Sequence, residues 1–313
     1  MSTLPVSISD QRRGTLLGVT AYLIWGFAAL YWVQLEAVDT RDMLAHRAVW
    51  TVVAVVLFLL VAGRLTATLR LLRQPRTVAV MAGSALFSAA NWGVFLWAVT
   101  HEQATEASLG YFLLPLVNVA IGLTLFGERI DTAQKWGVGF AVAAVLVQIQ
   151  YYGGLPVVAL SLAFSFGLYG AIRKGAAVES MDGLLLEALL MLPFAVAWLI
   201  YREGGGFGEH GLRVDLFLVG SGFFSAVPLI TYVAASRLLP LTALGLVFYI
   251  GPTAQLLVAV LVFKEPLVTA QIVAFGLVWI GLVLVTLDGY RRARRLEHPA
   301  QTTTEKAAPA AGD

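Results

Sequence analysis

The stretch FGERIDTAQ, residues 126–134, recurs 137 residues later as FKEPLVTAQ, residues 263–271, with five of nine positions identical. Each copy stands between two long apolar runs. The same offset relates Gly83 and Ser84 to Gly220 and Ser221, Pro115 to Pro252, Asn118 to Gln255, and Gly139 to Gly276. The pattern predicts that the chain consists of a duplicated half.

The composition is typical of a membrane protein. Of the 313 residues, 59% are hydrophobic and 13% are charged, and the mean hydropathy is +0.81. A membrane-spanning helix needs roughly 20 predominantly apolar residues. We therefore expect an all-α integral membrane protein with ten transmembrane helices, at about 14–33, 40–60, 78–99, 107–126, 132–150, 155–172, 183–201, 214–234, 241–262 and 269–287. The longest loops, 61–77 and 201–213, are too short for a soluble domain.

These spans divide into two sets of five. The first five-helix repeat covers 14–150 and the second 155–287, with an N-terminal segment, 1–13, and a disordered tail, 291–313. Because five is an odd number, the second copy must enter the bilayer in the opposite orientation. Inverted-topology repeats are common in secondary transporters, whose similar halves can exchange conformations. The sequence thus predicts two inverted-topology repeats.

Charge distribution predicts the orientation. If the N-terminus is cytoplasmic, the inner loops and the tail hold 15 Lys and Arg residues and the outer loops hold 4, leaving out Arg47 and Lys306. Cytoplasmic segments carry such an excess of positive charge. We therefore expect both termini to be cytoplasmic.

Several phrases, taken in order, carry a resemblance to a known family: AYLIWG (21–26), HRAVW (46–50), NWGVFLWAV (91–99), EASLGYFLLPLVN (106–118), FGER (126–129), AFSFGLYGAIRK (163–174) and VFYIGPT (247–253). Over about 14–290 the chain resembles the RarD branch of the EamA family, in the drug/metabolite transporter superfamily. The resemblance implies a ten-helix permease of the bacterial inner membrane with cytoplasmic termini, linked by name to chloramphenicol sensitivity. It implies no particular substrate. The second-half turn begins FKEP, a departure from the FGER pattern that weakens any expectation of strictly symmetric gating.

Arg47 is the first candidate for the substrate pathway. It lies seven residues inside the second expected span, roughly 10 Å deep at 1.5 Å per residue. A charge there is costly unless it faces a cavity or a partner. We interpret Arg47 as a binding group for an anion or a carboxylate, with snorkelling to the outer surface as the alternative. The adjacent His46 is either a proton-coupling group that lines the pathway or a hydrogen-bonded core residue.

Polar residues and prolines share one face of the fourth span and recur in the ninth. Tyr111, Pro115 and Asn118 are spaced as helical neighbours, and Pro252 and Gln255 repeat them. Proline frees a backbone carbonyl, which a neighbour or water must satisfy. We therefore expect a polar seam with a gating kink, or a kink that only improves packing. We place Tyr249, from the phrase VFYIGPT, in the same pathway.

Other intramembrane groups are candidates for the pathway or for coupling. The amide of Asn91 contacts either substrate or another helix. Glu187 is the one carboxylate well inside a second-half span, and it serves either in proton coupling or in an ion pair with Arg173 or Lys174. Trp25, with nearby aromatic residues, could form an aromatic box around an apolar or cationic ligand.

The repeated turn holds the last two candidates, Glu128 and Glu265. Under the inverted topology Glu128 lies inside and Glu265 outside. Either these carboxylates take part in gating, or the phrase is simply a turn followed by a helix start.

The sequence is compared with three classes of function: a transporter, an enzyme, and a membrane sensor or scaffold. The leading hypothesis is a secondary transporter, either permease or exporter, that moves a small organic metabolite or drug-like solute by alternating access. An ATP-driven pump is disfavoured because the chain has no GxxxxGK[ST] phosphate loop, and an enzyme because it has no HExxH motif and no cysteine. A membrane sensor or scaffold stays open as the alternative. We expect no cofactor, metal site or nucleic-acid partner. Protons are a possible coupling ion; substrate, transport direction and oligomeric state stay open.

Overall fold

The computed structural model of the chain describes residues 8–125, 127, 132–236, 238–239 and 247–297. Within these ranges all regular secondary structure is helical. The elements are α1 (Ile8–Gly26), α2 (Ala28–Trp32), η1 (Val33–Leu35), α3 (Thr40–Val61), α4 (Leu65–Arg70), η2 (Leu71–Arg73), α5 (Pro75–Thr100), α6 (Ala104–Leu125), α7 (Thr132–Tyr152), α8 (Val157–Gly175), α9 (Ser180–Tyr201), α10 (Leu212–Ser236), α12 (Ile250–Leu257), η3 (Val258–Val262) and α13 (Thr269–Glu297).

The described helices confirm the prediction of an all-helical membrane protein. Seven of the described helices, α3, α5, α6, α7, α9, α10 and α13, are long and apolar enough to cross a membrane, and counting the bent pair formed by α1 and its continuation makes eight. The expected spans 155–172 and 241–262 correspond to shorter apolar helices, Val157–Arg173 and Ile250–Val262. Residues 241–246 lie outside the described ranges. The count of ten spans stays a prediction.

Two expectations need correction. The first expected span is not one straight helix, because it bends by 44° between Gly26 and Ala28. Gly26 packs so closely on α12 that a Cβ there would lie 2.8 Å from the carbonyl oxygen of Gly251, and glycine is a common site of helix kinks. The expected loop 61–77 contains the short helix α4 and the turn η2.

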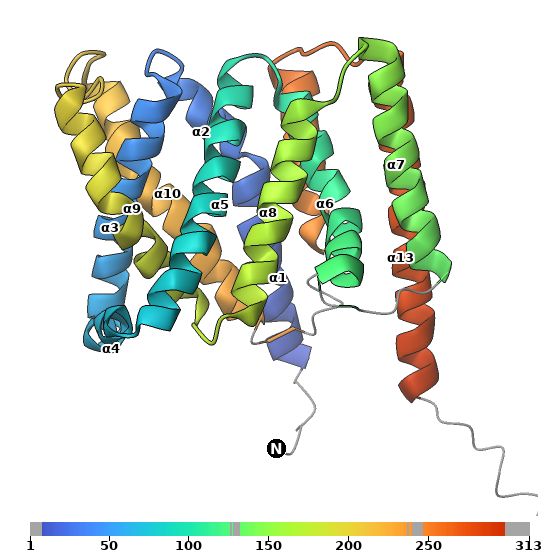
Figure 1. The fold of residues 1–313 in the computed structure, drawn as a ribbon, viewed down its shortest axis with the longest axis horizontal. Coiled ribbons are helices and arrows are strands. Elements are labelled where there is room, and N and C mark those ends of the chain that lie inside the picture. The colour runs from blue at the N-terminus through green and yellow to red at the C-terminus, as the bar shows by residue number, and fades with distance from the viewer. Residues whose placement is uncertain (1–7, 126, 128–131, 237, 240–246, 298–313) are drawn as a thin grey trace, which may run out of the picture.

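The helices form one bundle, shown in Figure 1. The long helices α7 and α13 pack along each other at one end, and α3, α9 and α10 pack together at the other. Helix α1 begins and α13 ends on the same side of the bundle (Figure 1). The opposite side, where α3, α6 and α8 begin, is called here the Asp39 side after the residue that precedes α3.

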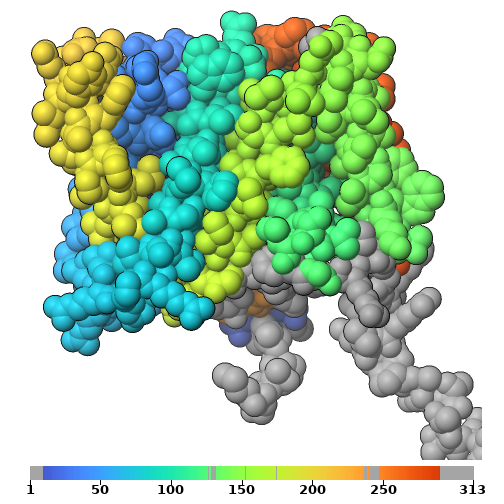
Figure 2. Space-filling view, in the orientation of Figure 1, coloured from blue at the N-terminus to red at the C-terminus, as the bar shows by residue number. Residues whose placement is uncertain are grey.

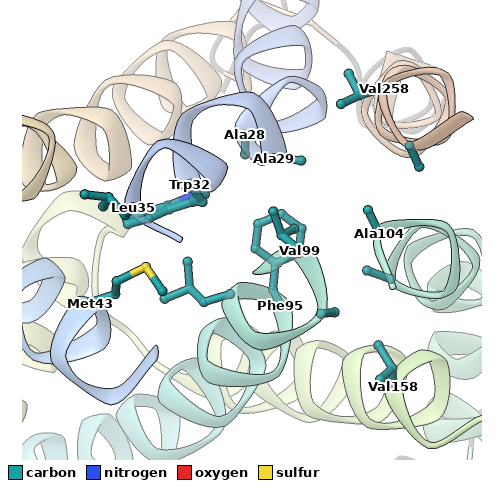
Figure 3. Packing of buried hydrophobic residues seen from close by; sticks show 14 of the residues in the cluster. Ala28, Ala29, Trp32, Leu35, Met43, Phe95, Val99, Ala104, Val158 and Val258 are labelled. Atoms are coloured by element: carbon teal, nitrogen blue, oxygen red, sulfur yellow. The ribbon is translucent and has the colours of Figure 1, made fainter. Parts of the chain in front are cut away.

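The largest buried cluster lies toward the Asp39 side and joins six α-helices with η1 and η3. Trp32 of α2 is fully buried and lies near Met43 of α3 and Phe95 of α5 (Figure 3). Val158 of α8 and Val258 of η3 reach the same cluster from the far side of the bundle. Segments that are more than 200 residues apart in sequence thus share one core.

The outward faces of the helices are apolar. Leu86 of α5, Leu146 of α7 and Phe194 of α9 are 68%, 57% and 77% exposed. Figure 2 shows the side chains of α5, α8 and α9 next to one another on one face of the bundle. Since the helices satisfy their own backbone hydrogen bonds, such a surface is compatible with lipid.

Small residues allow the closest helix contacts. A Cβ on Gly222 of α10 would lie 2.0 Å from the carbonyl oxygen of Trp50 in α3. This contact with backbone supports a packing role for the small residues Gly220 to Gly222.

We predict that Gly222→Ala lowers the free energy of unfolding by about 1–3 kcal/mol, because α10 must move away from α3. The matched control is Gly276→Ala in α13, where an added Cβ meets nothing within 4 Å; it should be neutral or stabilising by up to about 1 kcal/mol. Unfolding of both variants in mixed micelles would measure the difference. Equal stability of the two would contradict the close packing of α3 and α10.

Candidate functional site

Arg47 is buried at the centre of the site. Helix α3 begins after Asp39, whose carboxylate accepts a hydrogen bond from the Arg41 backbone N–H at 2.8 Å. Two turns later, Arg47 is only 7% exposed, and its guanidinium carbon lies 3.9 Å from the centroid of the Trp92 ring in α5. A side chain that stacks on a neighbouring helix does not reach the outer surface. The geometry therefore favours the interior position of Arg47 over snorkelling.

Three buried N–H groups near this position lack acceptors among the described residues. They are Nε of Arg47 and the indole nitrogens of Trp32 and Trp50. Trp32 contacts Trp92 with ring centroids 6.0 Å apart, and Trp50 follows Arg47 by three positions on α3. All three groups can only donate hydrogen bonds. Arg47 and these two indoles thus offer hydrogen-bond donors without acceptors among the described residues, and the buried hydroxyl of Thr51, one turn further along α3, likewise has no partner among them.

Glu187 of α9 has partners of its own. Its Oε1 accepts a hydrogen bond from the Ser84 hydroxyl of α5 at 2.5 Å and lies 3.7 Å from Nη1 of Arg173 in α8. Tyr169 of α8 also interacts with it. The structure thus places Glu187 beside Arg173, one of the two ion-pair partners that the sequence offered.

Asn91 and Tyr111 lie together. The Tyr111 hydroxyl donates to Oδ1 of Asn91 at 3.0 Å. The Asn91 amide donates to the Leu162 carbonyl at 3.1 Å and to the Ser165 hydroxyl at 3.0 Å. These bonds fasten α5 and α6 to α8. Tyr111 and Glu187 are also close enough to interact electrostatically with Arg47.

His46 does not turn toward Arg47. Its Nε2 donates to the carbonyls of Gly204 and Gly205 at 3.0 and 3.2 Å, and its ring stacks on Phe207. One turn earlier, Asp42 accepts from the Trp198 indole at 2.7 Å and from Arg202 at 3.2 Å. His46 therefore ties the α9–α10 connection to α3, as its hydrogen-bonded reading required.

The α9–α10 connection and the start of α3 both lie at the end of the membrane-spanning segments, so the charges there are solvent-accessible. The hydrogen bond to Asp42 raises the pKa of Arg202, and the hydrogen bond from Arg41 lowers the pKa of Asp39. The connection turns sharply because Gly204, with φ of 109°, adopts a backbone conformation that other residues rarely take.

Trp25 and Tyr249 belong to a second aromatic cluster between α1, α10 and α12. Tyr22 lies 5.5 Å from both Trp25 and Phe248, and Phe248 lies 5.6 Å from Tyr249, between ring centroids. Among the described residues, no ring of this cluster contacts Trp92, whose ring neighbours are Trp32 and Phe95.

The remaining seam residues are divided between surface and core. Asn118 is exposed and lies beside Gly167 of α8, whereas Gln255 is buried in α12. Pro115 lies inside α6, where it removes the N–H that would bond the Tyr111 carbonyl. The carbonyl of Pro252 accepts from the Ser108 hydroxyl at 2.9 Å, which joins α6 to α12.

Glu265 caps another helix. Its two carboxylate oxygens accept hydrogen bonds from the backbone N–H groups of Ala104 and Thr105, at 2.8 and 2.7 Å. These are the first N–H groups of α6, where a negative charge is favourable. Glu128, the matching residue of the first half, lies outside the described residues.

Sequence reasoning missed several of these groups. Ser84, Tyr169 and the capping carboxylate Glu106, which accepts from the Val158 N–H of α8 at 3.1 Å, were not singled out. Glu106 and Tyr169 stand in phrases that carry the family resemblance, and Ser84 is a repeat position, but none of these patterns indicates a partner. In the part of the chain that the structure describes, no cluster of three His, Cys, Asp or Glu residues could hold a metal.

Comparison with known proteins places this bundle in a family. Residues 12–149 match the EamA-like transporter family. Protein RarD of Streptomyces exfoliatus is 40% identical over 304 residues, which cover 96% of this chain and 95% of that protein. The chain belongs to the EamA-like transporter family. This membership confirms two predictions, that the chain belongs to the drug/metabolite transporter superfamily and that it is a membrane transporter.

Two further relatives align with this EamA-like transporter over similar lengths. Protein RarD of Escherichia coli K12 is 36% identical over 289 residues, covering 91% of this chain and 98% of that protein. The chloramphenicol-sensitive protein RarD of Pseudomonas aeruginosa is 33% identical over 290 residues, covering 90% and 96%. A solved crystal structure with 22% identity and a TM-score of 0.57 covers 88% of this chain and 97% of its own and shares the fold.

The buried Arg47 and the partly buried Arg173 of the transporter differ in energetic role. A charge at the centre of a membrane helix costs about 2.5–3.5 kcal/mol on insertion scales, and a desolvated cation–π contact returns about 2 kcal/mol. Arg47 has that contact and, among the described residues, no ion pair. Arg173, in contrast, compensates the buried Glu187.

We predict that Arg47→Met leaves the free energy of unfolding unchanged or raises it by about 1 kcal/mol. Arg173→Met should lower it by about 3 kcal/mol, because Glu187 loses its ion-pair partner. Unfolding of the ligand-free protein in mixed micelles measures both variants. A large loss of stability in Arg47→Met would mean that Arg47 has a structural role.

Proposed function

We propose that the chain is a secondary transporter that moves a small organic solute across the bacterial inner membrane by alternating access of two inverted five-helix halves. In this proposal both termini are cytoplasmic and the Asp39 side faces outward. Family membership supports transport across a membrane. The observation that carries the mechanism is the way helix contacts repeat when the two halves are exchanged.

The 137-residue offset pairs α1 with α8, α3 with α9, α5 with α10, α6 with α12 and η3, and α7 with α13. When each helix is replaced by its counterpart in the other half, one observed contact between helices corresponds to another. The contact of α6 with α8 becomes that of α12 with α1, α3 with α10 becomes α9 with α5, and α5 with α8 becomes α10 with α1. The contacts of α7 with α13 and of α3 with α9 map onto themselves. This pattern supports a two-fold relation between the halves.

The described contacts fit a state that is closed on the Asp39 side. The cap of Glu265 on α6 joins a second-half turn to a first-half helix, and Val258 of η3 packs beside it in the largest buried cluster. Opening this side would separate the two halves and break both contacts. We therefore assign Glu265 to the outer gate.

Protons are the proposed coupling ion, with Glu187 as the carrier residue. It is buried and faces Arg173 and Tyr169 of α8, Ser84 of α5 and Arg47 of α3. Protonation would release Arg173, so a proton could change contacts between α8 and α9. His46, held by the α9–α10 connection, is the weaker candidate for this role.

Transport itself is tested in proteoliposomes that contain only this protein. We predict that radiolabelled organic solutes from a panel of acids, amines and amphenicols include at least one that exchanges across the bilayer faster than in protein-free vesicles, and that an imposed pH gradient accelerates its uptake. Glu187→Gln should retain exchange but lose the effect of the gradient. A folded protein without flux for any panel member would favour a sensor or scaffold.

The absence of cysteine from the chain allows a direct test of the gate. Ala107, buried in α6, is replaced by cysteine and labelled from outside with a membrane-impermeant maleimide. We predict that Glu265→Gln increases the labelling rate about tenfold, because the loss of a charged hydrogen bond costs about 1–3 kcal/mol. Glu102→Gln, an exposed change on the same side, is the control. Equal rates in both variants would remove Glu265 from the gate.

A further inference from the structure

The buried charges of the bundle are unequally compensated. Four carboxylates are buried in the described part of the chain. Asp42 pairs with Arg202, Asp182 with Arg64, and Glu187 with Arg173, while Glu265 caps α6. Within these residues Arg47 is a buried cation to which no carboxylate comes within ion-pair distance. An anion is therefore the missing partner of Arg47.

The uncharged indole N–H groups near Arg47 also lack a hydrogen-bond acceptor in the described part of the chain. The buried N–H groups of Trp32 and Trp50 can donate but not accept, and neither finds an acceptor among the described residues. The carbonyl of Asn91, by contrast, already accepts from Tyr111. A ligand group with several acceptor atoms, such as a carboxylate, would satisfy these donors.

Aromatic rings extend from the same point. Trp32 lies 6.0 Å from Trp92, Trp92 lies 5.8 Å from Phe95, and Phe95 lies 6.1 Å from Tyr111, between ring centroids. Tyr111 continues the row to Phe166 at 6.1 Å. These rings are packed against one another beside Arg47, and they are the side chains that an apolar or aromatic body would contact on binding.

A zwitterionic amino acid fits less well. Its ammonium group would require a carboxylate without a partner near Arg47. Glu187, the carboxylate that interacts with Arg47, already accepts from Ser84 and pairs with Arg173. The charge balance thus favours a plain organic acid.

We propose that the transported solute is an organic anion with a ring-sized apolar body, whose carboxylate binds Arg47 and the indole N–H groups beside it while the body lies along the row from Trp92 to Tyr111. This assignment rests on the proposed function only in calling the ligand a substrate. The binding site itself does not depend on transport.

The test uses the full-length protein in detergent and calorimetric titration with five probes. They are 3-phenylpropionate, its neutral amide, 3-phenylpropan-1-amine, L-phenylalanine and acetate. We expect 3-phenylpropionate to bind at least tenfold more tightly than each of the others. Arg47→Gln should weaken its binding at least tenfold, whereas Arg213→Gln, a change at the bundle surface, should not.

Thermal unfolding of each variant without ligand verifies that it is folded. Tighter binding of the amide or the amine, or unchanged binding of 3-phenylpropionate to Arg47→Gln, would overturn the proposal. Equal binding of L-phenylalanine would replace the organic acid by an amino acid, and equal binding of acetate would reduce the site to one for small anions. No binding of any probe to folded wild-type protein would also overturn it.

Flux of labelled 3-phenylpropionate in proteoliposomes separates the two proposals. Binding without flux of this or any other solute would contradict the transporter and leave the anion site in place. Flux of another solute by a protein that does not bind 3-phenylpropionate would support the transporter and contradict the anion site.

Discussion

Within a bilayer, polar groups must find their partners inside the protein, and this constraint organises the bundle. Glu265 satisfies the first N–H groups of α6, and Glu106 does the same for α8. Asn91 joins three helices through four polar groups. Apart from the bond between Tyr111 and Asn91, each of these bonds connects segments more than 50 residues apart, so satisfying the polar groups also determines which helices are neighbours.

Arg47 is the exception to this rule, and the exception is informative. Its insertion cost is only partly offset by stacking on Trp92. Residues that reduce stability in this way are common at functional sites, where a ligand supplies the missing interaction. Under the proposed anion site, the contrast with Arg173, whose charge is compensated by Glu187, distinguishes a residue kept for binding from one kept for structure.

The alternating access proposed for this protein would require contacts between the halves that are strong enough to close a face and weak enough to break. The cap of Glu265 on α6 has this character, since it consists of two charged hydrogen bonds in a turn and not of a helix packed along its length. The contact of α7 with α13 is extensive and maps onto itself when the halves are exchanged, as expected of a pair that stays together while other helices move. Close packing at Gly222 likewise holds α10 against α3.

The sequence by itself determined the helical membrane class and the family, because hydropathy and ordered phrases are properties of the chain alone. The 137-residue offset predicts the two-repeat organisation. The sequence also identified Arg47, Asn91, Tyr111 and Glu187 as unusual, since polar groups in apolar runs are visible without a structure. Only the tertiary structure decided their partners. His46 and Arg47 are adjacent in sequence yet point to different neighbours, because successive side chains on a helix differ in direction by about 100°. The break after Gly26 and the cap of Glu265 on α6 depend on segments more than 150 residues away. Periodicity indicates which face of a helix is polar, but the packing of the other helices determines what that face meets.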